Sequence, residues 1–384
     1  MSKRTSSVRL AGWLGLFVIL SAALAVTAFA LTRSDGPKPP KRPLAAAIRS
    51  SFAGKPVMGV SADLAITQHL LPGASTLVSQ SMGATGHVWA THGSVHLQLR
   101  SSQLGVVDAT FNGRQAMLWD RKAHAAFVLA VKHDHQTQAE RTGGLPSLAE
   151  IQSALTRATR HIGLSGAIPS TVAGRPAYTV RVTPRHAAGL LGAAELAWDS
   201  QHGTPLRFAI YPRGSSTPAI EIAVTNIRYG AVPASDLVVR PTAGTKIERV
   251  HLPRRSEVAS ASNHAHSVTG MSAVAGAVGF RLVAPSVVGS QVRTSVRSVS
   301  LGGSPAALVV YGRGLGATVV LEQRAGAHAN PLSALPTATI AGRPGRELDT
   351  TLGTLVQFTR GGVTYTVAGF QPSATIVSAA GSLR

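Results

Sequence analysis

The sequence has no cysteine and is poor in aromatic and acidic residues. The lack of cysteine excludes disulfides, cysteine-ligated zinc sites, thiol catalysis and lipid attachment through an N-terminal cysteine. Aromatic residues make up only 5% of the chain, which leaves little surface for stacking on single-stranded nucleic acid. Only 16 acidic residues stand against 37 Lys and Arg, giving a formal net charge of +21. That excess favours anionic partners such as acidic lipid headgroups or wall polymers.

The chain also lacks the sequence motifs of common enzymes. It contains no paired acidic residues, Gly-x-Ser-x-Gly elbow, P-loop or His-Glu-x-x-His motif. Its basic residues are scattered along the chain, singly or in pairs, and form no longer Lys/Arg block, so nucleic acid is not an expected partner. We therefore expect a protein that is not an enzyme and carries no cofactor.

A long apolar run lies near the N-terminus. The first nine residues carry three basic side chains and no acid, and Leu10–Thr32 then contains no charge. The run is long enough to span a bilayer as a helix, and the preceding positive charge predicts a cytoplasmic N-terminus. The alternative is a signal peptide cleaved after Ala30, because Ala28-Phe29-Ala30 has the small-x-small form of a cleavage site. Both interpretations place Arg33–Arg384 outside the cytoplasmic membrane.

The clearest strand pattern spans Thr171–Tyr229. Three stretches alternate apolar and polar residues, and each is bounded by Gly, Pro or Ser. This predicts an antiparallel meander with one apolar and one polar face. Near Thr225-Asn226 the alternation changes phase, which predicts a β-bulge that bends the sheet.

Two helices are expected beside this meander. Ser147 and Glu150 have capping-box spacing, and apolar residues then recur every three or four positions as far as Ile162. The apolar stripe of this helix is a natural partner for the apolar face of the meander. A short helix is expected at Leu44–Phe52.

Short extended runs on both sides of the meander predict the other strands. Asn112-Gly113 between two such runs is a strong two-residue hairpin signal. An Ala-Gly-Arg-Pro sequence occurs at both 173–176 and 341–344, which predicts a shared turn conformation. The patterns divide the chain into a membrane segment (1–32), a Pro-rich linker (33–43), a first unit (44–249), a second linker (250–270) and a smaller second unit (271–384).

Three groups of residues in the first unit form recognisable motifs, namely Asn112-Gly113 with Trp119-Asp120, Ala173–Tyr178, and Trp198-Asp199 with Gly203–Arg207. Together they resemble motifs of the bacterial LolA-like and RseB-like family of periplasmic lipoprotein carriers and sigma-factor regulators. The resemblance covers Leu44–Val250, whereas Gly270–Arg384 resembles an uncharacterised C-terminal domain of bacterial membrane-tethered proteins.

This resemblance implies a fold and a binding function. The expected fold is mainly β with a few helices (α+β). It comprises an antiparallel curved half-barrel sheet wrapped on helices, a smaller antiparallel β-rich domain, and an N-terminal transmembrane helix. The family has an apolar cavity that takes acyl chains or a peptide and has no catalytic residues. A tethered protein cannot shuttle freely, so sensing or local handling of a ligand fits better than transport.

The large side chains of the sheet are the candidate groove residues, namely Trp89, Trp119, Trp198, Phe208 and Tyr178. They line the ligand cavity if the helix leaves space above the sheet. In the alternative, they are ordinary core residues.

Other candidate sites are weaker. His133-Asp134-His135 has donors for a metal but lies in a polar loop, and His264 and His266 lie in the second linker, so no metal site is expected. Gly312–Gly316 is glycine-rich, but no helix is predicted after it, which favours a hairpin turn over a phosphate loop.

The sequence thus predicts non-enzymatic, extracytoplasmic binding of a lipid, lipoprotein or peptide in an apolar groove. The resemblance adds regulation of an envelope-stress sigma-factor pathway, with an anti-sigma factor as partner. The alternative is an envelope interaction protein whose basic surface docks anionic wall polymers or lipid headgroups.

Overall fold

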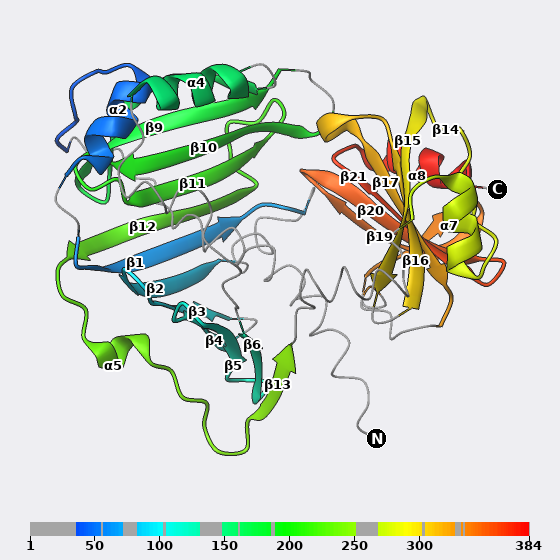
Figure 1. The fold of residues 1–384 in the computed structure, drawn as a ribbon, viewed down its shortest axis with the longest axis horizontal. Coiled ribbons are helices and arrows are strands. Elements are labelled where there is room, and N and C mark those ends of the chain that lie inside the picture. The colour runs from blue at the N-terminus through cyan, green and yellow to red at the C-terminus, as the bar shows by residue number, and fades with distance from the viewer. Residues whose placement is uncertain are drawn as a thin grey trace.

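The computed structural model describes residues 36–54, 57–71, 83–102, 105–130, 148–159, 162–185, 189–250, 268–301, 304–326, 332 and 335–383. Their fold is mainly β, with a few helices and two sheets (Figure 1). Within these ranges no helix is long and apolar enough to cross a membrane. The apolar run Leu10–Thr32 lies outside the described residues.

The first sheet has 13 strands in the order β13-β6-β5-β4-β3-β2-β1-β12-β11-β10-β9-β7, with β8 paired to β9. Their bounds are β1 (Gly59–Gln68), β2 (Ala84–Thr91), β3 (Val95–Ser101), β4 (Gly105–Phe111), β5 (Gln115–Asp120), β6 (Ala125–Ala130), β7 (Ile162–Leu164), β8 (Ile168–Val172), β9 (Arg175–Pro184), β10 (Leu191–Asp199), β11 (Pro205–Pro212), β12 (Ile220–Tyr229) and β13 (Lys246–Val250). The sheet curls into a half-barrel, as the resemblance implied (Figure 1). Helices α2 (Leu44–Phe52) and α4 (Leu148–Ala158) lie side by side at its β9 end.

The predicted bulge is present in β12. Asp63 pairs with Asn226, whereas Leu64 pairs with Val224, so Thr225 is an extra residue in the ladder. A bulge of this kind increases the local twist and bends the strand. The phase change in the sequence therefore marks one point where the sheet curls.

The predicted hairpin turns also form. Asn112 N donates to Gln115 O at 3.1 Å and Gly113 has φ +79°, so the central residues of this turn are Gly113 and Arg114, one position later than predicted. Ala173 and Ala341, the equivalent residues of the two Ala-Gly-Arg-Pro sequences, have φ values of +50° and +52°. The two sequences therefore adopt the same left-handed turn conformation, which a β-branched residue in place of either alanine would strain.

The second sheet has eight strands in the order β14-β15-β16-β17-β21-β20-β19-β18. Their bounds are β14 (Val287–Val288), β15 (Gln291–Leu301), β16 (Ser304–Tyr311), β17 (Thr318–Arg324), β18 (Thr337–Ile340), β19 (Arg343–Thr350), β20 (Gly353–Arg360) and β21 (Val363–Gly369), with helices α7 (Met271–Val278) and α8 (Ser373–Gly381). Cross-strand pairing sets four fully buried valines in one row, namely Val309, Val320, Val367 and Val356. Val274 of α7 and Ile376 of α8 belong to the same apolar core.

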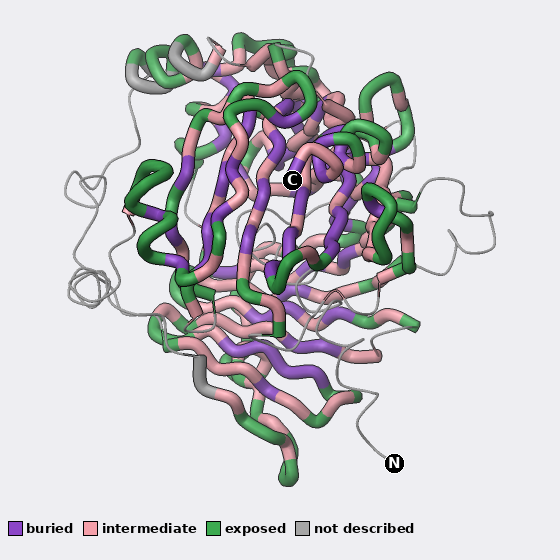
Figure 2. The backbone as a smooth tube through the Cα atoms, turned by 90° about the vertical axis from the view of Figure 1, so that its right-hand side faces the viewer, coloured by how far each residue is buried: buried purple, intermediate pink, exposed green. Residues whose placement is uncertain are grey.

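Burial follows the strands of both sheets. In Figure 2 the buried segments run along the strands, and the exposed segments are mostly turns and helix surfaces. Each buried Val or Ile contributes about 1.5–3 kcal/mol relative to an exposed one, so the two sheets hold most of the apolar stabilisation of the described chain.

The sheet is antiparallel as expected, except at one edge. β13 pairs with β6 in parallel, from Lys246 opposite Ala125 to Val250 opposite Leu129. The chain leaves β12 in the middle of the sheet and passes through the short helix α5 (Ala234–Leu237) before it reaches the β6 edge (Figure 1). This crossover connection allows a strand to enter parallel to its neighbour.

Candidate binding face

Tyr178 and Trp198 pack beneath helix α2. They form a buried apolar cluster with Ala47 and Val180, and the two rings are 2% and 5% exposed. Trp198 Nε1 donates to Ser51 Oγ at 3.0 Å, and Ser51 Oγ donates to Ala47 O at 2.9 Å. The helix that covers these aromatic residues is thus α2, which fills the space above them.

The Pro-rich segment before α2 is also docked on the sheet. Tyr178 Oη donates to Pro40 O at 2.7 Å, and Thr171 Oγ1 donates to Gly36 O at 3.0 Å. Pro39 is buried. A shallow cavity of about 430 Å³ lies between this segment and the start of β9. The described part of the predicted linker therefore follows the protein surface, bound at several points.

Phe208 lies in an apolar row that crosses four neighbouring strands. Cross-strand pairing joins Ile66 to Ile222, Ile222 to Phe208, and Phe208 to Leu196. Ile222 is buried and the other three are half-buried. Ile66 lies two residues from Leu64 on the same face of β1, and Leu64 belongs to a larger apolar cluster that extends over β2 to β5. The apolar face of the meander thus continues across most of the curled sheet.

Trp89 and Trp119 do not belong to that face. They alternate along β2 and β5 with Val88 and Leu118, which are members of the apolar cluster. Trp89 instead stacks on His96 at a centroid distance of 4.8 Å. Because neighbouring residues of a strand point to opposite faces, one groove cannot contain all five predicted aromatic residues. The strand register places only Tyr178, Trp198 and Phe208 of the five on the same face of the sheet.

The face that carries Trp89 and Trp119 is polar, and its side chains are joined by several hydrogen bonds. The buried carboxylate of Asp108 accepts hydrogen bonds from His96 Nε2 at 3.0 Å, Gln98 Nε2 at 3.0 Å and Arg121 Nε at 2.5 Å. Burial alone would raise the pKa of Asp108, but the bonds from His96, Arg121 and Gln98 outweigh it and hold the pKa at about 2. The carboxylate is therefore ionised under ordinary conditions.

A second charged group covers the polar side of the meander. Arg207 Nη1 and Tyr211 Oη lie 2.7 and 2.8 Å from Glu195 Oε2, and Arg181 Nη1 lies 2.7 Å from Glu195 Oε1. Burial alone would raise the pKa of Glu195, but these partners lower it overall. The long side chains lie over small residues such as Ala209, which is fully buried. This face therefore has its apolar surface closed by paired charges.

A larger cavity of about 950 Å³ lies on the second sheet, where α8 meets β20 and the β18–β19 turn. Its wall includes Arg343, Arg360 and Phe358. Among the described residues no cluster of three His, Asp or Glu side chains could hold a metal ion. His133-Asp134-His135, His264 and His266 lie outside the described residues.

The comparisons with known proteins point to solved structures only. No protein-family model and no curated protein matches the sequence. The chain is similar to MucB in complex with MucA(peri), at 17% identity and a TM-score of 0.41, covering 89% of this chain and 96% of that one. A MucA/MucB complex from Pseudomonas aeruginosa matches at 17% identity and a TM-score of 0.40, covering 88% and 94%.

A LolA superfamily protein, NE2245 from Nitrosomonas europaea, is also similar. It matches at 8% identity and a TM-score of 0.24, covering 52% of this chain and 99% of that one. The solved structures to which the chain is similar thus include a LolA superfamily protein, and LolA-like proteins are one of the two groups whose motifs the sequence resembles.

Proposed function

We propose that this protein binds an acyl chain or an extended apolar peptide, without catalysis, on the apolar face of its first sheet. The observation that carries the proposal is the continuous row of half-buried apolar side chains through Ile66, Phe208 and Leu196. Sites for lipids and small apolar ligands are lined mostly by apolar and aromatic side chains, as this row is. Tyr178 and Trp198 act in this proposal as the packed floor beneath α2.

The partner and the location are further parts of the proposal. The motif resemblance supports a lipoprotein, or a peptide from an anti-sigma factor, as the natural ligand in an envelope-stress pathway. We place the protein outside the cytoplasmic membrane, tethered by Leu10–Thr32 or released by cleavage after Ala30. The solved MucB structure to which the chain is similar is a complex with MucA(peri).

Photo-crosslinking tests the site directly. The full chain in membranes is irradiated with a 16-carbon fatty acid that carries a diazirine, and the modified peptides are identified by mass spectrometry. We expect crosslinks in β1 and β10–β12. Phe208→Asp should reduce them at least tenfold, because it removes about 1.5–3 kcal/mol of apolar burial and adds a charge.

Phe370→Asp is the matched control, because Phe370 is 45% exposed and lies after β21 of the other sheet. It should leave the crosslinks unchanged. Crosslinks that are spread evenly over the chain, or that survive Phe208→Asp, would contradict the proposal. Binding of an anionic polymer that weakens with salt, with no crosslinks, would favour the basic surface as the functional region.

A further inference from the structure

Ser61, His87 and Asp63 form a hydrogen-bonded chain on the polar face of β1 and β2. Ser61 Oγ lies 2.8 Å from His87 Nε2, and His87 Nδ1 lies 2.7 Å from Asp63 Oδ1. With its hydrogen on Nδ1, the ring donates to the carboxylate and its Nε2 accepts from the serine hydroxyl. A serine nucleophile, its general base and the carboxylate that orients the base have this connectivity on many unrelated folds.

The strand register explains why the three side chains meet. Asp63 is directly opposite His87 in the antiparallel pair, and Ser61 lies two residues along β1, on the same face. All three therefore project from paired strands, which hold them more rigidly than loops would. No sequence motif predicts this arrangement, because His87 is 24 residues from Asp63 in the chain.

The neighbouring residues fit an acyl-transfer site. Ser61 is paired with Arg228 on one side and with Trp89 on the other. Arg228 is exposed, so its guanidinium is available on the same face to stabilise negative charge that develops beside Ser61. The Trp89 ring lies 4.1 Å from the His87 ring, centroid to centroid, and restricts its rotation.

Asn226 supports the carboxylate from β12, since its Nδ2 lies 3.3 Å from Asp63 Oδ2. The bulge at Thr225 sets this position, because it shifts Asn226 into register with Asp63. Asp63 and Asn226 are therefore positioning residues, whereas Ser61 and His87 would touch the substrate.

The site is open to solvent. The side chains of His87 and Asp63 are 29% and 49% exposed. A small substrate can reach Ser61 without any movement of the sheet, but water reaches the same atoms and weakens every charge interaction there. This favours slow turnover of short, reactive esters over cleavage of peptide bonds.

We propose that Ser61 is the nucleophile of a carboxylic-ester hydrolase site. Ser61 Oγ attacks the carbonyl carbon while His87 Nε2 takes the hydroxyl proton. The tetrahedral intermediate expels the alcohol, which receives that proton, and leaves an ester on Ser61. Water, deprotonated by His87, then attacks this ester, releases the carboxylic acid and returns the proton to Ser61.

This site goes beyond the proposed function and does not depend on it. It lies on the polar face, since Ser61 and Asp63 alternate along β1 with Leu64 and Ala62 of the apolar cluster. Phe208→Asp should therefore lose fatty-acid crosslinking and keep ester hydrolysis. Ser61→Ala should lose ester hydrolysis and keep fatty-acid crosslinking.

A fluorophosphonate probe and the ester p-nitrophenyl butyrate test the inference on the full chain. We expect covalent labelling of the peptide that contains Ser61, and none in Ser61→Ala. His87→Gln should lower hydrolysis roughly 10²–10⁴-fold, the usual contribution of a general base. Asp63→Asn should reduce the rate with no loss of melting temperature, and Asp63→Glu should restore part of it, which a purely structural role would not predict.

Ser94→Ala, in the turn between β2 and β3, is the serine control and should keep wild-type labelling. If Ser61→Ala fails to fold, Ser61→Cys takes its place and should lose fluorophosphonate labelling but gain labelling by iodoacetamide. A folded wild-type protein that is not labelled at Ser61, or that hydrolyses the ester as fast as Ser61→Ala does, overturns the inference.

Discussion

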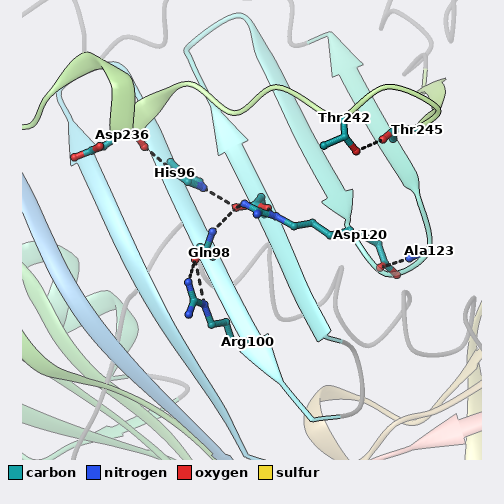
Figure 3. A network of polar contacts seen from close by, with 10 residues as sticks. His96, Gln98, Arg100, Asp120, Ala123, Asp236, Thr242 and Thr245 are labelled. Atoms are coloured by element: carbon teal, nitrogen blue, oxygen red, sulfur yellow. Dashed lines mark hydrogen bonds and ion pairs between the residues drawn. The ribbon is translucent and has the colours of Figure 1, made fainter.

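The Asp108 carboxylate in β4 contacts β3 and the turn after β5, and His96 extends this network to the crossover segment. His96 Nε2 lies 3.0 Å from Asp108 Oδ1. On the other side of the ring, Nδ1 lies 2.6 Å from the carbonyl oxygen of Asp236 (Figure 3). These contacts form a hydrogen-bonded chain from Asp108 through His96 to Asp236, which fastens α5 to the face of β3.

The low pKa of Asp108 predicts a pH dependence of stability. The folded pKa of about 2 lies below the ordinary value of 3.8, so the stabilisation is present above pH 4 and is lost as the pH falls through about 2. The difference corresponds to about 2 kcal/mol. Urea unfolding of Asp108→Asn should give a lower free energy of unfolding than wild type at pH 5.5, and the gap should narrow by pH 2.5.

Glu248→Gln provides the comparison for that experiment. Glu248 is 44% exposed and pairs with Lys246, which is 76% exposed. Exposed pairs contribute about 0–1 kcal/mol, so this variant should follow wild type at every pH. A constant gap between Asp108→Asn and wild type from pH 5.5 to 2.5 would show that the carboxylate contributes by packing alone.

At the level of elements, the sequence predicted most strands but not how their faces are used. The alternation within Thr171–Tyr229 predicted β9, β10, β11 and β12, which the structure places side by side in one antiparallel meander. β19 (Arg343–Thr350) was missed because it is half-buried or exposed throughout and has no apolar alternation.

The candidate groove was only partly predictable, for a related reason. Aromatic content alone cannot distinguish the two faces of a strand, so Trp89 and Trp119 were grouped with Trp198, although their neighbours Val88 and Leu118 carry the apolar face. Ser61 and His87 were not predicted, since their proximity depends on strand register.

The contact between α2 and β10 depends on one buried hydrogen bond. Ser51→Ala would leave Trp198 Nε1 without its partner, which costs about 1–3 kcal/mol in a buried position. Ser50 is the matched control, because its hydroxyl bonds only to Ala47 O within the helix. Thermal unfolding followed by tryptophan fluorescence should show a lower melting temperature for Ser51→Ala and little change for Ser50→Ala. Equal effects would mean that helix propensity, and not the Trp198 bond, controls the docking.

At the scale of the whole molecule, main-chain hydrogen bonds join the two sheets. Leu190 N donates to Phe370 O at 2.5 Å, and Thr351 N donates to Leu70 O at 2.8 Å. Thr351 Oγ1 also donates to His69 O at 3.0 Å. These contacts connect the loop before β10 and the end of β1 with two turns of the second sheet. In the described part of the chain no buried apolar cluster contains residues of both sheets, so these directional bonds are the contacts that join them.

Gly189 makes this junction testable. Its φ is +95°, and a β-carbon at that position would lie 2.2 Å from Phe370 O, far inside contact distance. Gly189→Ala should therefore break the hydrogen bond from Leu190 N to Phe370 O and loosen the sheets relative to each other, while each core stays folded.

Gly214→Ala is the control, because its φ is +74° but nothing lies near its β-carbon. Both variants incur the backbone cost of about 1 kcal/mol for alanine at positive φ. Small-angle X-ray scattering should show a larger radius of gyration for Gly189→Ala alone, whereas equal radii would mean that the remaining contacts suffice to hold the sheets together.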